Sequence, residues 1–582
     1  MTPAPFPVDV RAVRKTFRRK NGETVEALAG VSFAARARTL TALVGPDGGG
    51  KTTLLRILAG LTPADSGGVR VLGLDVAAAP QAVQARIGYM PQRFGLYEDL
   101  TVQQNLDLYA DLHGVDGAAR EQACARLLAM MALTPFTGRL AGKLSGGMKQ
   151  KLGLACTLVR APALLLLDEP TVGVDPLSRR ELWEIVRRLV RDDALTAVVS
   201  TSYLDEAGFC DHTVALHRGV VLAEGAPGEI AAQAAGRVFL ATPAAETNAR
   251  ALQARLFQSR DVADAVPEAG KVRVVARTPN APENAPDTTF AAAQPRFEDG
   301  FMLLFDAVAD GRAVQSVPAG RAGNAPGNAA PNPVEVRDLV RRFGDFTAVD
   351  HVSFQVRRGE IYGLLGPNGA GKSTTFRMLC GLLPASAGSL RVAGADLRRA
   401  RAGAREKLGY VAQKFSLYGD LSVDENLDFF ASAYGLRGHR KRARIAWAKE
   451  QFNLDAMASL PAGQLPGGYK QRLAMAAALL HEPEILFLDE ATSGADPMAR
   501  RAFWARIAAL AEAGVTVIVT THFMEEAEYC DRVLIMDGGV ALAEGSPAEI
   551  RARALPGQDA PTMEAAFISI IETARKTGRA QA

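Results

Sequence analysis

The chain has 582 residues, of which 48% are hydrophobic and 22% charged, and it carries a formal net charge of +4. Its length indicates about three to five domains, and its small net charge excludes a polycation that binds nucleic acid through charge alone. The five cysteines are scattered without metal-ligand spacing, which favours reduced thiols over a zinc or disulfide framework. No apolar leader or membrane-spanning stretch stands out, so we expect a soluble protein whose work at a membrane needs a partner.

The N-terminal part of the chain shows the patterns of alternating strands and helices. Alternating apolar residues over 8–17 predict a strand, and the apolar run 40–44 predicts a buried strand that enters a glycine-rich turn and then a helix. Continuous apolar runs predict further buried strands over 164–168 and 195–201. Strands that alternate with helices indicate an α/β fold with a parallel sheet, which binds ligands at the carboxyl ends of its strands.

The middle of the chain divides into two stretches. Residues 236–306 hold expected strands over 238–240 and 272–275 and a helical stretch over 249–256, so we expect a small appended α/β segment that ends in a closing helix. Residues 307–333 are rich in Gly, Pro and Ala and have little to bury, which predicts a flexible linker.

The C-terminal part of the chain repeats the N-terminal part. Gly45 aligns with Gly366, and the same offset relates Asp175 to Asp496, so the register holds without a net insertion. This pattern indicates a duplicated domain. The expected division is a first domain over 6–235, the appended segment over 236–306, the linker over 307–333, a second domain over 334–555, and a closing helix with a tail over 556–582.

Each copy carries the pattern G-x-x-x-x-G-K-[ST] between an expected strand and an expected helix. Glycines at such a turn let backbone amides face inward and surround phosphate oxygens at a helix N-terminus. We expect Lys51 and Lys372 to contact the β- and γ-phosphates, and the hydroxyls of Thr52 and Ser373 to ligate Mg²⁺. The expected nucleotide-binding residues of the two turns are Gly45, Pro46, Asp47, Gly48, Gly49, Gly50, Lys51, Thr52 and Thr53, and Gly366, Pro367, Asn368, Gly369, Ala370, Gly371, Lys372, Ser373 and Thr374.

An Asp-Glu pair ends one buried strand in each copy. Asp168 and Asp489 are expected to hold Mg²⁺ at this position. The adjacent Glu169 and Glu490 are placed to polarise an attacking water as general bases. The combination of a glycine-rich turn and an acidic strand end predicts an enzyme that hydrolyses a nucleoside triphosphate.

The segment Leu-Ser-Gly-Gly-Met-Lys-Gln over 144–150 resembles the signature motif of ATP-binding cassette (ABC) ATPases. The resemblance covers both halves of the chain, and it implies that the enzyme is an ATPase with ATP and Mg²⁺ as cofactors. It also implies two tandem P-loop NTPase domains of the α/β class, each with a parallel-strand core, an antiparallel β subdomain and a helical subdomain.

The resemblance implies roles for further residues. Gln92 and Gln413 would touch the metal or its water, and Phe17 and Phe343 would stack on adenine, with a place in the core as the alternative. Asp175 and Asp496 would be the D-loop aspartates. The signature residues that would contact ATP are Ser145, Gly146 and Gly147 in the first copy and Gly467 and Gly468 in the second.

In this family each ATP lies between the P-loop of one domain and the signature of the other, so two departures from the motifs fall together. Pro466 replaces the signature serine of the second copy, and Ser202 replaces the switch histidine of the first. Both belong to the site of Lys51 and Glu169, here called the first ATP site. The second ATP site keeps the full set of Ser145, Lys372, Glu490 and His522.

We therefore predict that the second ATP site hydrolyses ATP, with Glu490 and His522 as catalytic residues, and that the first site mainly binds it. A lost hydrogen bond to a charged phosphate costs about 1.5–3 kcal/mol. The alternative is that Pro466 merely begins a helix, where proline is tolerated, and that both sites turn over with Glu169 as the second general base.

Beyond the motifs of ATP hydrolysis, the chain resembles ABC-2 or multidrug-type export ATPases. The resemblance lies in the segments that end at Gln92 and Tyr97, in their counterparts that end at Gln413 and Tyr418, and in the closing Pro-x-x-Glu-x-x-Phe segments. It implies an ATP-binding subunit that drives separate ABC-2-type transmembrane permease subunits. Such a protein would be cytoplasmic and peripheral, held at the cytoplasmic face of the inner membrane through the permease.

An alternative of another class is a soluble tandem ABC ATPase that acts on ribosomes. Those proteins typically join their halves through long, highly charged helices and keep both signatures intact. Here residues 236–333 between the halves are not highly charged, and Pro466 interrupts the second signature. A third class, the DNA-repair cassette ATPases, needs zinc-binding cysteine pairs that this sequence lacks. We expect no nucleic-acid partner.

Overall fold

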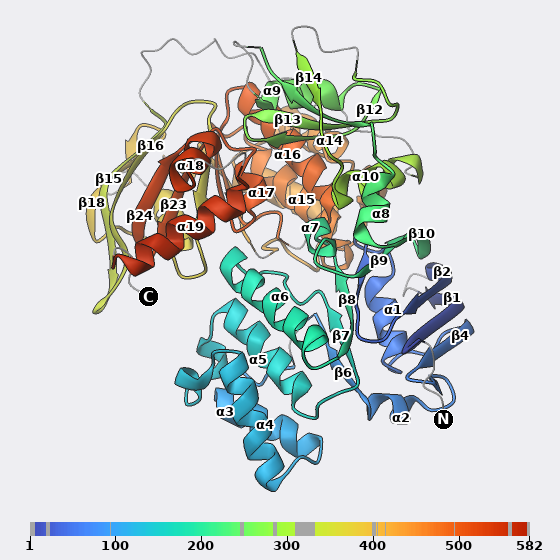
Figure 1. Cartoon of the computed structure of the whole chain (residues 1–582). Coiled ribbons are helices and arrows are strands. Elements are labelled where there is room, and N and C mark those ends of the chain that lie inside the picture. Colours follow the sequence, from blue (N-terminus) through green and yellow to red (C-terminus); the bar gives the residue numbers. More distant parts are fainter. Residues whose placement is uncertain are drawn as a thin grey trace.

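The structure is a computed structural model of the chain. It describes residues 6–18, 24–92, 95–244, 249–282, 288–308, 332–397, 403, 405–413, 415–493, 495–556 and 561–578. Two copies of one α/β architecture follow each other, coloured blue to green and yellow to red in Figure 1. We call residues 6–235 the first half and residues 334–578 the second half. Most of the expected linker, residues 309–331, lies outside the described residues.

The first half contains two sheets. The antiparallel sheet has four strands, which are, in order across the sheet, β2 (Thr24–Ala35), β1 (Val8–Arg18), β4 (Ser66–Val71) and β5 (Leu74–Asp75). The second sheet is parallel apart from its first strand, and its order is β10 (Val220–Gly225), β9 (His212–His217), β3 (Leu40–Val44), β8 (Thr196–Thr201), β7 (Leu164–Asp168) and β6 (Ile87–Met90).

The parallel sheet forms the core because its central strands are buried on both faces. All five residues of β3 and all five of β7 are buried, as their continuous apolar runs predict. The helices are α1 (Lys51–Leu58), α2 (Pro80–Gln84), α3 (Val102–Leu112), α4 (Gly117–Met130), α5 (Gly146–Leu158), α6 (Pro176–Arg191), α7 (Leu204–Ala207) and α8 (Pro227–Ala232), with short 3₁₀ turns at Thr134–Phe136 and Ala141–Lys143.

The second half repeats both sheets. Its antiparallel sheet has the order β16 (Phe346–Val356), β15 (Val334–Phe343), β18 (Ala387–Val392) and β19 (Ala395–Asp396). Its second sheet has the order β20 (Leu408–Val411), β21 (Ile485–Asp489), β22 (Thr516–Thr521), β17 (Ile361–Leu365), β23 (Arg532–Asp537) and β24 (Val540–Gly545), again parallel apart from β24.

The described helices of the second half correspond to helices of the first half, and the second half ends in a further helix. They are α11 (Lys372–Leu379), α13 (Val423–Ala433), α14 (Gly438–Gln451), α15 (Gly467–Leu479), α16 (Pro497–Glu512), α17 (Met524–Ala527), α18 (Pro547–Ala554) and the closing helix α19 (Met563–Lys576), with 3₁₀ turns at Asp455–Met457 and Ala462–Gln464. Figure 1 shows α19 beside α6, and Arg180 pairs with Glu572 across this contact at 2.7 Å.

The appended segment forms a small antiparallel sheet that contacts two helices. The strand order is β12 (Val262–Glu268), β13 (Lys271–Ala276), β11 (Val238–Thr242) and β14 (Thr289–Ala292), and the helices are α9 (Ala249–Phe257) and the closing α10 (Phe297–Val308). The sequence patterns located β11, β13 and α9 but missed β12 and β14. β12 contains Pro267 and β14 has only four residues, so neither has a clear strand pattern.

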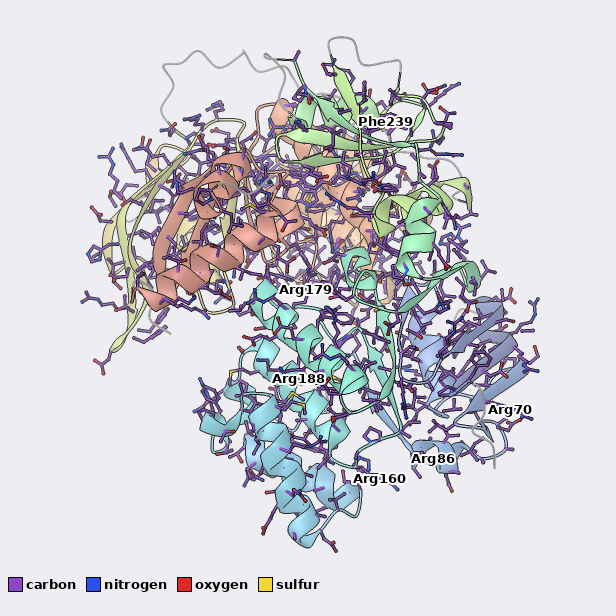
Figure 2. The ribbon with its side chains drawn as sticks, viewed as in Figure 1. Arg70, Arg86, Arg160, Arg179, Arg188 and Phe239 are labelled. Atoms are coloured by element: carbon purple, nitrogen blue, oxygen red, sulfur yellow. The ribbon has the colours of Figure 1, made fainter. Side chains whose placement is uncertain are left out.

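The appended segment contacts both halves: its closing helix α10 packs in the core of the first half, and its sheet and α9 lie against the second half. Arg501 of α16 is buried and pairs with Asp264 at 3.0 Å, and Arg250 pairs with Asp531 at 2.8 Å. Figure 2 shows Phe239 on this segment, and Arg179 on the part of α6 that faces the second half. Within the described residues, we find no helix of the length and hydropathy that a membrane crossing requires.

Candidate ATP sites between the two halves

The two glycine-rich turns connect β3 to α1 and β17 to α11. Lys51 Nζ donates to the carbonyls of Gly45 and Pro46 at 2.7 and 3.1 Å, and Lys372 makes the equivalent bonds at 2.6 and 2.9 Å. Both lysines are buried. A buried ammonium group bonded to its own turn, beside the first amides of a helix, provides the charge and the donors that bind phosphate.

Gly50 shows why this turn needs glycine. Its φ of 103° is left-handed, and a Cβ built on it would lie 2.6 Å from the carbonyl oxygen of Ala27. Gly371 has a φ of 95°, and its Cβ would lie 2.6 Å from the carbonyl oxygen of Ala348. Both glycines immediately precede the helix of the turn, so a larger residue would distort the phosphate-binding turn in either half.

The acidic strand ends lie beside the helices of the turns. Thr52 Oγ1 donates to Asp168 Oδ1 at 3.0 Å, which brings together two of the oxygen atoms expected to ligate Mg²⁺. Ser200 orients Asp168 through a 2.6 Å hydrogen bond, and Thr520 orients Asp489 at 2.7 Å. The sequence analysis missed Ser200 and Thr520, although a hydroxyl residue occupies this strand position in both copies.

Both general-base candidates have a strained backbone. Glu169 has a φ of 49° and Glu490 a φ of 45°, in the left-handed region that side chains other than glycine rarely adopt. Such strain persists only where the surrounding structure holds it, and it is common at active sites. Its presence at the same residue of both halves indicates that the duplicated backbone geometry has been kept.

In the second ATP site, Glu490 is held by two partners. His522 Nδ1 lies 3.2 Å from Glu490 Oε2, and Gln413 Nε2 donates to the same oxygen at 2.7 Å. Burial raises the pKa of Glu490, but the His522 hydrogen bond and charge, Lys372 and Gln413 outweigh it, so the net pKa lies below its usual range. His522 is 3% exposed, and its Nε2 has no hydrogen-bond partner among the described residues. A ligand oxygen would satisfy this nitrogen.

In the first ATP site, the expected nucleotide-contacting side chains bond to one another. Ser202 Oγ donates to Glu169 Oε1 at 2.8 Å and accepts from Lys51 Nζ at 3.2 Å. Lys51 also lies 3.6 Å from Glu169 Oε1, and Gln92 donates to Glu169 Oε2 at 2.7 Å. Ser202 therefore links the P-loop lysine directly to the general-base candidate. In the second site, His522 contacts Glu490 through Nδ1.

Each P-loop faces the signature of the other half. A Cβ built on Gly146 would lie 3.6 Å from Asn368 Nδ2, and one built on Gly467 would lie 3.8 Å from Asp47 Oδ2. The Asp47 amide also donates to the D-loop carboxylate of Asp496 at 3.3 Å. The two departures, Pro466 and Ser202, therefore belong to a single composite site, together with Asp47.

The two signatures begin their helices differently. Ser145 is the N-cap of α5, and its side chain accepts a hydrogen bond from the Met148 amide at 3.3 Å. Pro466 is the N-cap of α15 and makes no side-chain cap bond. Pro466 therefore does begin a helix, as the alternative interpretation assumes, but it also removes a hydroxyl from the first ATP site.

Asp47 adds a negative charge to the first ATP site. Partial desolvation where the halves approach each other and the nearby charge of Asp496 raise the pKa of Asp47 to about 6, despite the opposing effect of Lys51, although the residue remains exposed. The equivalent residue of the second site is the neutral Asn368. The first site therefore places the carboxylates of Asp47 and Asp496 together, whereas the second site has the amide of Asn368 in place of the Asp47 carboxylate.

The two aromatic residues expected at adenine lie outside the core. Phe17 at the end of β1 is 44% exposed, and Phe343 at the end of β15 is 46% exposed. Lys15 and Arg341 lie over the two rings at 5.4 and 4.4 Å from their centroids. The alternative place in the core is therefore wrong for both rings, and stacking on adenine stays a prediction.

Two α/β units, each with a P-loop, an acidic strand end and a signature that faces the other unit's P-loop, define a tandem ATP-binding cassette protein. The sequence model described as ABC transporter matches residues 28–172 and 349–493. The chain is 50% identical over 561 residues to the "Probable multidrug ABC transporter ATP-binding protein YbhF" of Escherichia coli (strain K12), which covers 95% of this chain and 96% of that protein. The chain belongs to the ABC transporter ATP-binding proteins and is an ABC-type ATPase with two cassettes.

Two further proteins match part of the chain. The "Nod factor export ATP-binding protein I" of Burkholderia orbicola (strain AU 1054) is 43% identical over 216 residues, 37% of this chain and 71% of that protein. A solved structure titled "Structure of ATP binding subunit of ABC transporter" is 29% identical, covers 39% of this chain and 92% of its own, and has a TM-score of 0.35.

Proposed function

We propose that the chain is the ATP-hydrolysing subunit of an ABC-2 or multidrug-type exporter and drives separate transmembrane permease subunits. It would bind them at the cytoplasmic face of the inner membrane. The names of the two relatives, a probable multidrug transporter protein and an export protein, support an exporter. Tyr97 and Tyr418, shortly after the two glutamines, are 57% and 51% exposed and would offer aromatic contacts to permease helices.

Within this exporter we propose that the second ATP site performs hydrolysis and that the first mainly binds ATP. The observation that carries this proposal is the switch position. His522 contacts Glu490 through Nδ1, and its Nε2 has no hydrogen-bond partner in the part of the chain that the structure describes, whereas Ser202 already bonds to both Lys51 and Glu169. Glu490 would take a proton from the attacking water at its carboxylate, and His522 Nε2 would donate to a γ-phosphate oxygen.

The residues present fit ATP and Mg²⁺. The buried lysines and the helix N-termini of the turns provide cationic charge and amide donors for phosphates. Mg²⁺ prefers oxygen ligands, which Thr52 and Asp168 offer in the first site. The proposed ligands of the two sites are Thr52, Gln92 and Asp168, and Ser373, Gln413 and Asp489. Bound Mg²⁺ would neutralise charge on the β- and γ-phosphates.

Co-purification tests the exporter proposal. The Glu490→Gln variant, which should retain ATP in a closed state, is tagged, extracted with mild detergent in ATP and Mg²⁺, and its stoichiometric partners are identified. We expect integral membrane subunits, and a Lys51→Ala/Lys372→Ala variant that cannot close on ATP serves as the control. Stoichiometric ribosomes without membrane subunits would overturn the proposal and favour a tandem ATPase that acts on ribosomes.

A further inference from the structure

The residues that directly follow the two switch positions meet where the halves join. Tyr203 follows Ser202, Phe523 follows His522, and their ring centroids lie 5.4 Å apart with an interplanar angle of 52°. Both rings are buried, with 2% and 7% exposed. The His522 ring also packs on Phe523 at 4.1 Å. The switch loops of the two ATP sites are therefore in direct contact through aromatic side chains.

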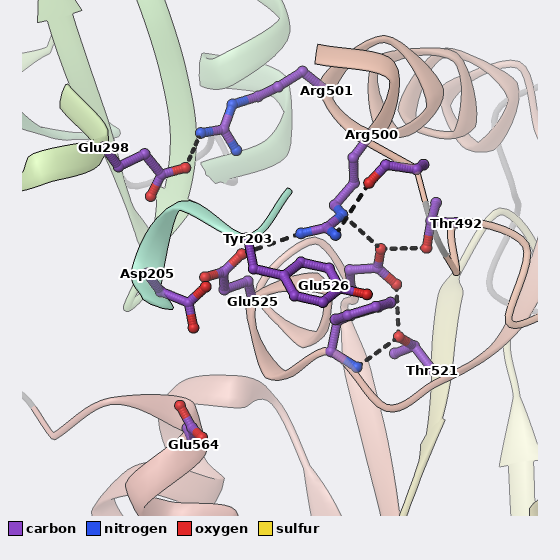
Figure 3. Close-up of polar contacts among 12 residues, drawn as sticks. Tyr203, Asp205, Glu298, Thr492, Arg500, Arg501, Thr521, Glu525, Glu526 and Glu564 are labelled. Carbon is purple, nitrogen blue, oxygen red and sulfur yellow. Dashed lines mark hydrogen bonds and ion pairs between the residues drawn. The ribbon is translucent and has the colours of Figure 1, made fainter. Parts of the chain in front are cut away.

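One arginine of the second half lies against both rings. The Arg500 guanidinium, from α16, is 4.5 Å from the Phe523 centroid and 5.5 Å from the Tyr203 centroid. Figure 3 shows it reaching from α16 to this junction. The side chain is buried, and a desolvated cation over an aromatic ring gains more than one in water. Arg500 thus packs simultaneously on the switch loops of both sites.

Two carboxylates next to the switch form ion pairs with Arg500. Its Nε lies 3.5 Å from Glu526 Oε1, and its Nη1 lies 3.5 Å from Glu525 Oε2. Glu526 accepts in turn from the hydroxyls of Thr492 and Thr521, as Figure 3 shows. These bonds tie the arginine to the end of β22, from which His522 follows.

Arg500 also lies one helical turn from the D-loop that enters the other site. It is on the first turn of α16, whose N-cap is Asp496, and Asp496 accepts the amide of Asp47 in the first P-loop. The equivalent arginine of the first half is held differently. Arg179 pairs with Asp205 at 2.6 Å and lies 3.6 Å from Glu564 of α19, while its guanidinium is 5.8 Å from Tyr203.

We propose that Arg500 is a positioning residue through which the first ATP site controls hydrolysis at the second. The proposal rests on the assignment of hydrolysis to the second site. Closure on nucleotide at the first site brings Asp47, Asp496 and the Tyr203 loop into place. Arg500 transmits this state to Phe523, which holds the His522 ring towards Glu490. The first site is then a regulatory nucleotide site.

A double-mutant cycle on the full chain tests this coupling. Lys51→Ala, which weakens nucleotide binding at the first site, is measured alone and with Arg500→Gln, and kcat and KM for ATP are determined for each. We expect Arg500→Gln to lower kcat about tenfold with KM within about twofold, and Arg500→Lys to restore much of the rate because it keeps a cation over the rings. Lys51→Ala should lower kcat several-fold in the parent chain and have no further effect beside Arg500→Gln.

Two variants separate coupling from general damage. Arg506→Gln removes another arginine of α16 that lies over a ring, 5.1 Å from the Phe452 centroid, and should leave kcat within about twofold. Tyr203→Leu removes the first-half ring and should reproduce the Arg500→Gln effect, which keeps the test decisive if Arg500→Gln fails to fold.

The outcomes distinguish the two proposals. If Lys51→Ala lowers kcat by the same factor with and without Arg500, the coupling is wrong. If Lys372→Ala leaves turnover in place while Lys51→Ala abolishes it, the assignment of the hydrolytic site is wrong instead, whatever the Arg500 variants do. Loss of turnover in Lys372→Ala, together with non-additive effects of Lys51 and Arg500, supports both.

Discussion

The two halves share one backbone design but differ at the places where they touch nucleotide. Both general-base candidates occupy the same left-handed conformation, and both P-loop lysines bond to the same two carbonyls of their turns. The switch residue differs: Ser202 bridges Lys51 and Glu169, whereas His522 Nε2 has no hydrogen-bond partner among the residues described. Duplication therefore preserved the phosphate-binding turns and diverged in the side chains that we propose act on the γ-phosphate.

The two halves also differ in what covers their equivalent arginines. Arg501 of α16 is buried by Asp264 of β12, while its counterpart Arg180 of α6 remains on the surface and pairs with Glu572. The appended sheet occurs once in the described chain, so it can cover only one half. It therefore makes the tandem protein asymmetric outside the ATP sites as well.

Removing the two general-base candidates one at a time should show the largest difference in ATPase activity between the two sites. We expect Glu490→Gln to lower steady-state ATPase activity at least ~100-fold, because a positioned general base contributes about 10²–10⁴-fold. Glu169→Gln should retain at least about half of the activity. Phosphate release at saturating ATP measures both, and equal losses in the two variants would show that the sites are equivalent.

The difference in cover predicts a difference in stability. Asp264→Ala leaves the Arg501 guanidinium buried with one fewer carboxylate, so we expect the free energy of unfolding to fall by about 3 kcal/mol. The matched variant Glu572→Ala removes the exposed partner of Arg180 and should cost less than about 1 kcal/mol. Urea denaturation of the purified chain compares them. Similar losses would contradict the view that the appended sheet buries only one of these arginines.

Restoring the imidazole and the signature hydroxyl should make the first ATP site more like the second. In the Glu490→Gln background, Ser202→His combined with Pro466→Ser should raise the residual ATPase activity at least about tenfold, since each regained hydrogen bond to charged phosphate is worth about 1.5–3 kcal/mol. The control Ser202→Ala with Pro466→Ser lacks the imidazole and should gain less. No difference between the double variants would show that the switch residue does not limit the first site.

Asp47 predicts a smaller, pH-dependent effect. Its pKa is raised to about 6 between the halves, so its charged form opposes closure, and closure is favoured as the pH falls through about 6. We expect Asp47→Asn to strengthen ATP retention at the first site several-fold at pH 7.5 and to remove its pH dependence between pH 5.5 and 7.5. Retention is measured with radiolabelled ATP in the Glu490→Gln chain. An unchanged pH profile in Asp47→Asn would contradict this role of Asp47.

The sequence predicted most of the fold because its strongest signals are local. The apolar runs over 40–44 and 361–365 match β3 and β17, and the glycine turns precede α1 and α11. It failed at β12 and β14, where strands form by pairing with β13 and β11 rather than by their own pattern. Pairing between distant segments leaves little trace in a single sequence.

The candidate site shows the same limit. Motifs located the lysines, carboxylates and signatures, but no motif indicated the contact between Tyr203 and Phe523 or the place of Arg500 against both rings. These contacts depend on how the two halves meet. Nor does any motif indicate that Asp47 meets Asp496, because Asp496 comes from the opposite half.

The central claim is that only the second ATP site hydrolyses its nucleotide, and nucleotide trapping tests it most directly. The unmodified chain is incubated with ATP, Mg²⁺ and vanadate, separated from free nucleotide, denatured, and analysed for bound ATP and ADP. Our account predicts equal amounts of ATP and ADP in each closed chain, with the ADP lost in Glu490→Gln and kept in Glu169→Gln. Trapped ADP in both sites, or its loss only in Glu169→Gln, would contradict it.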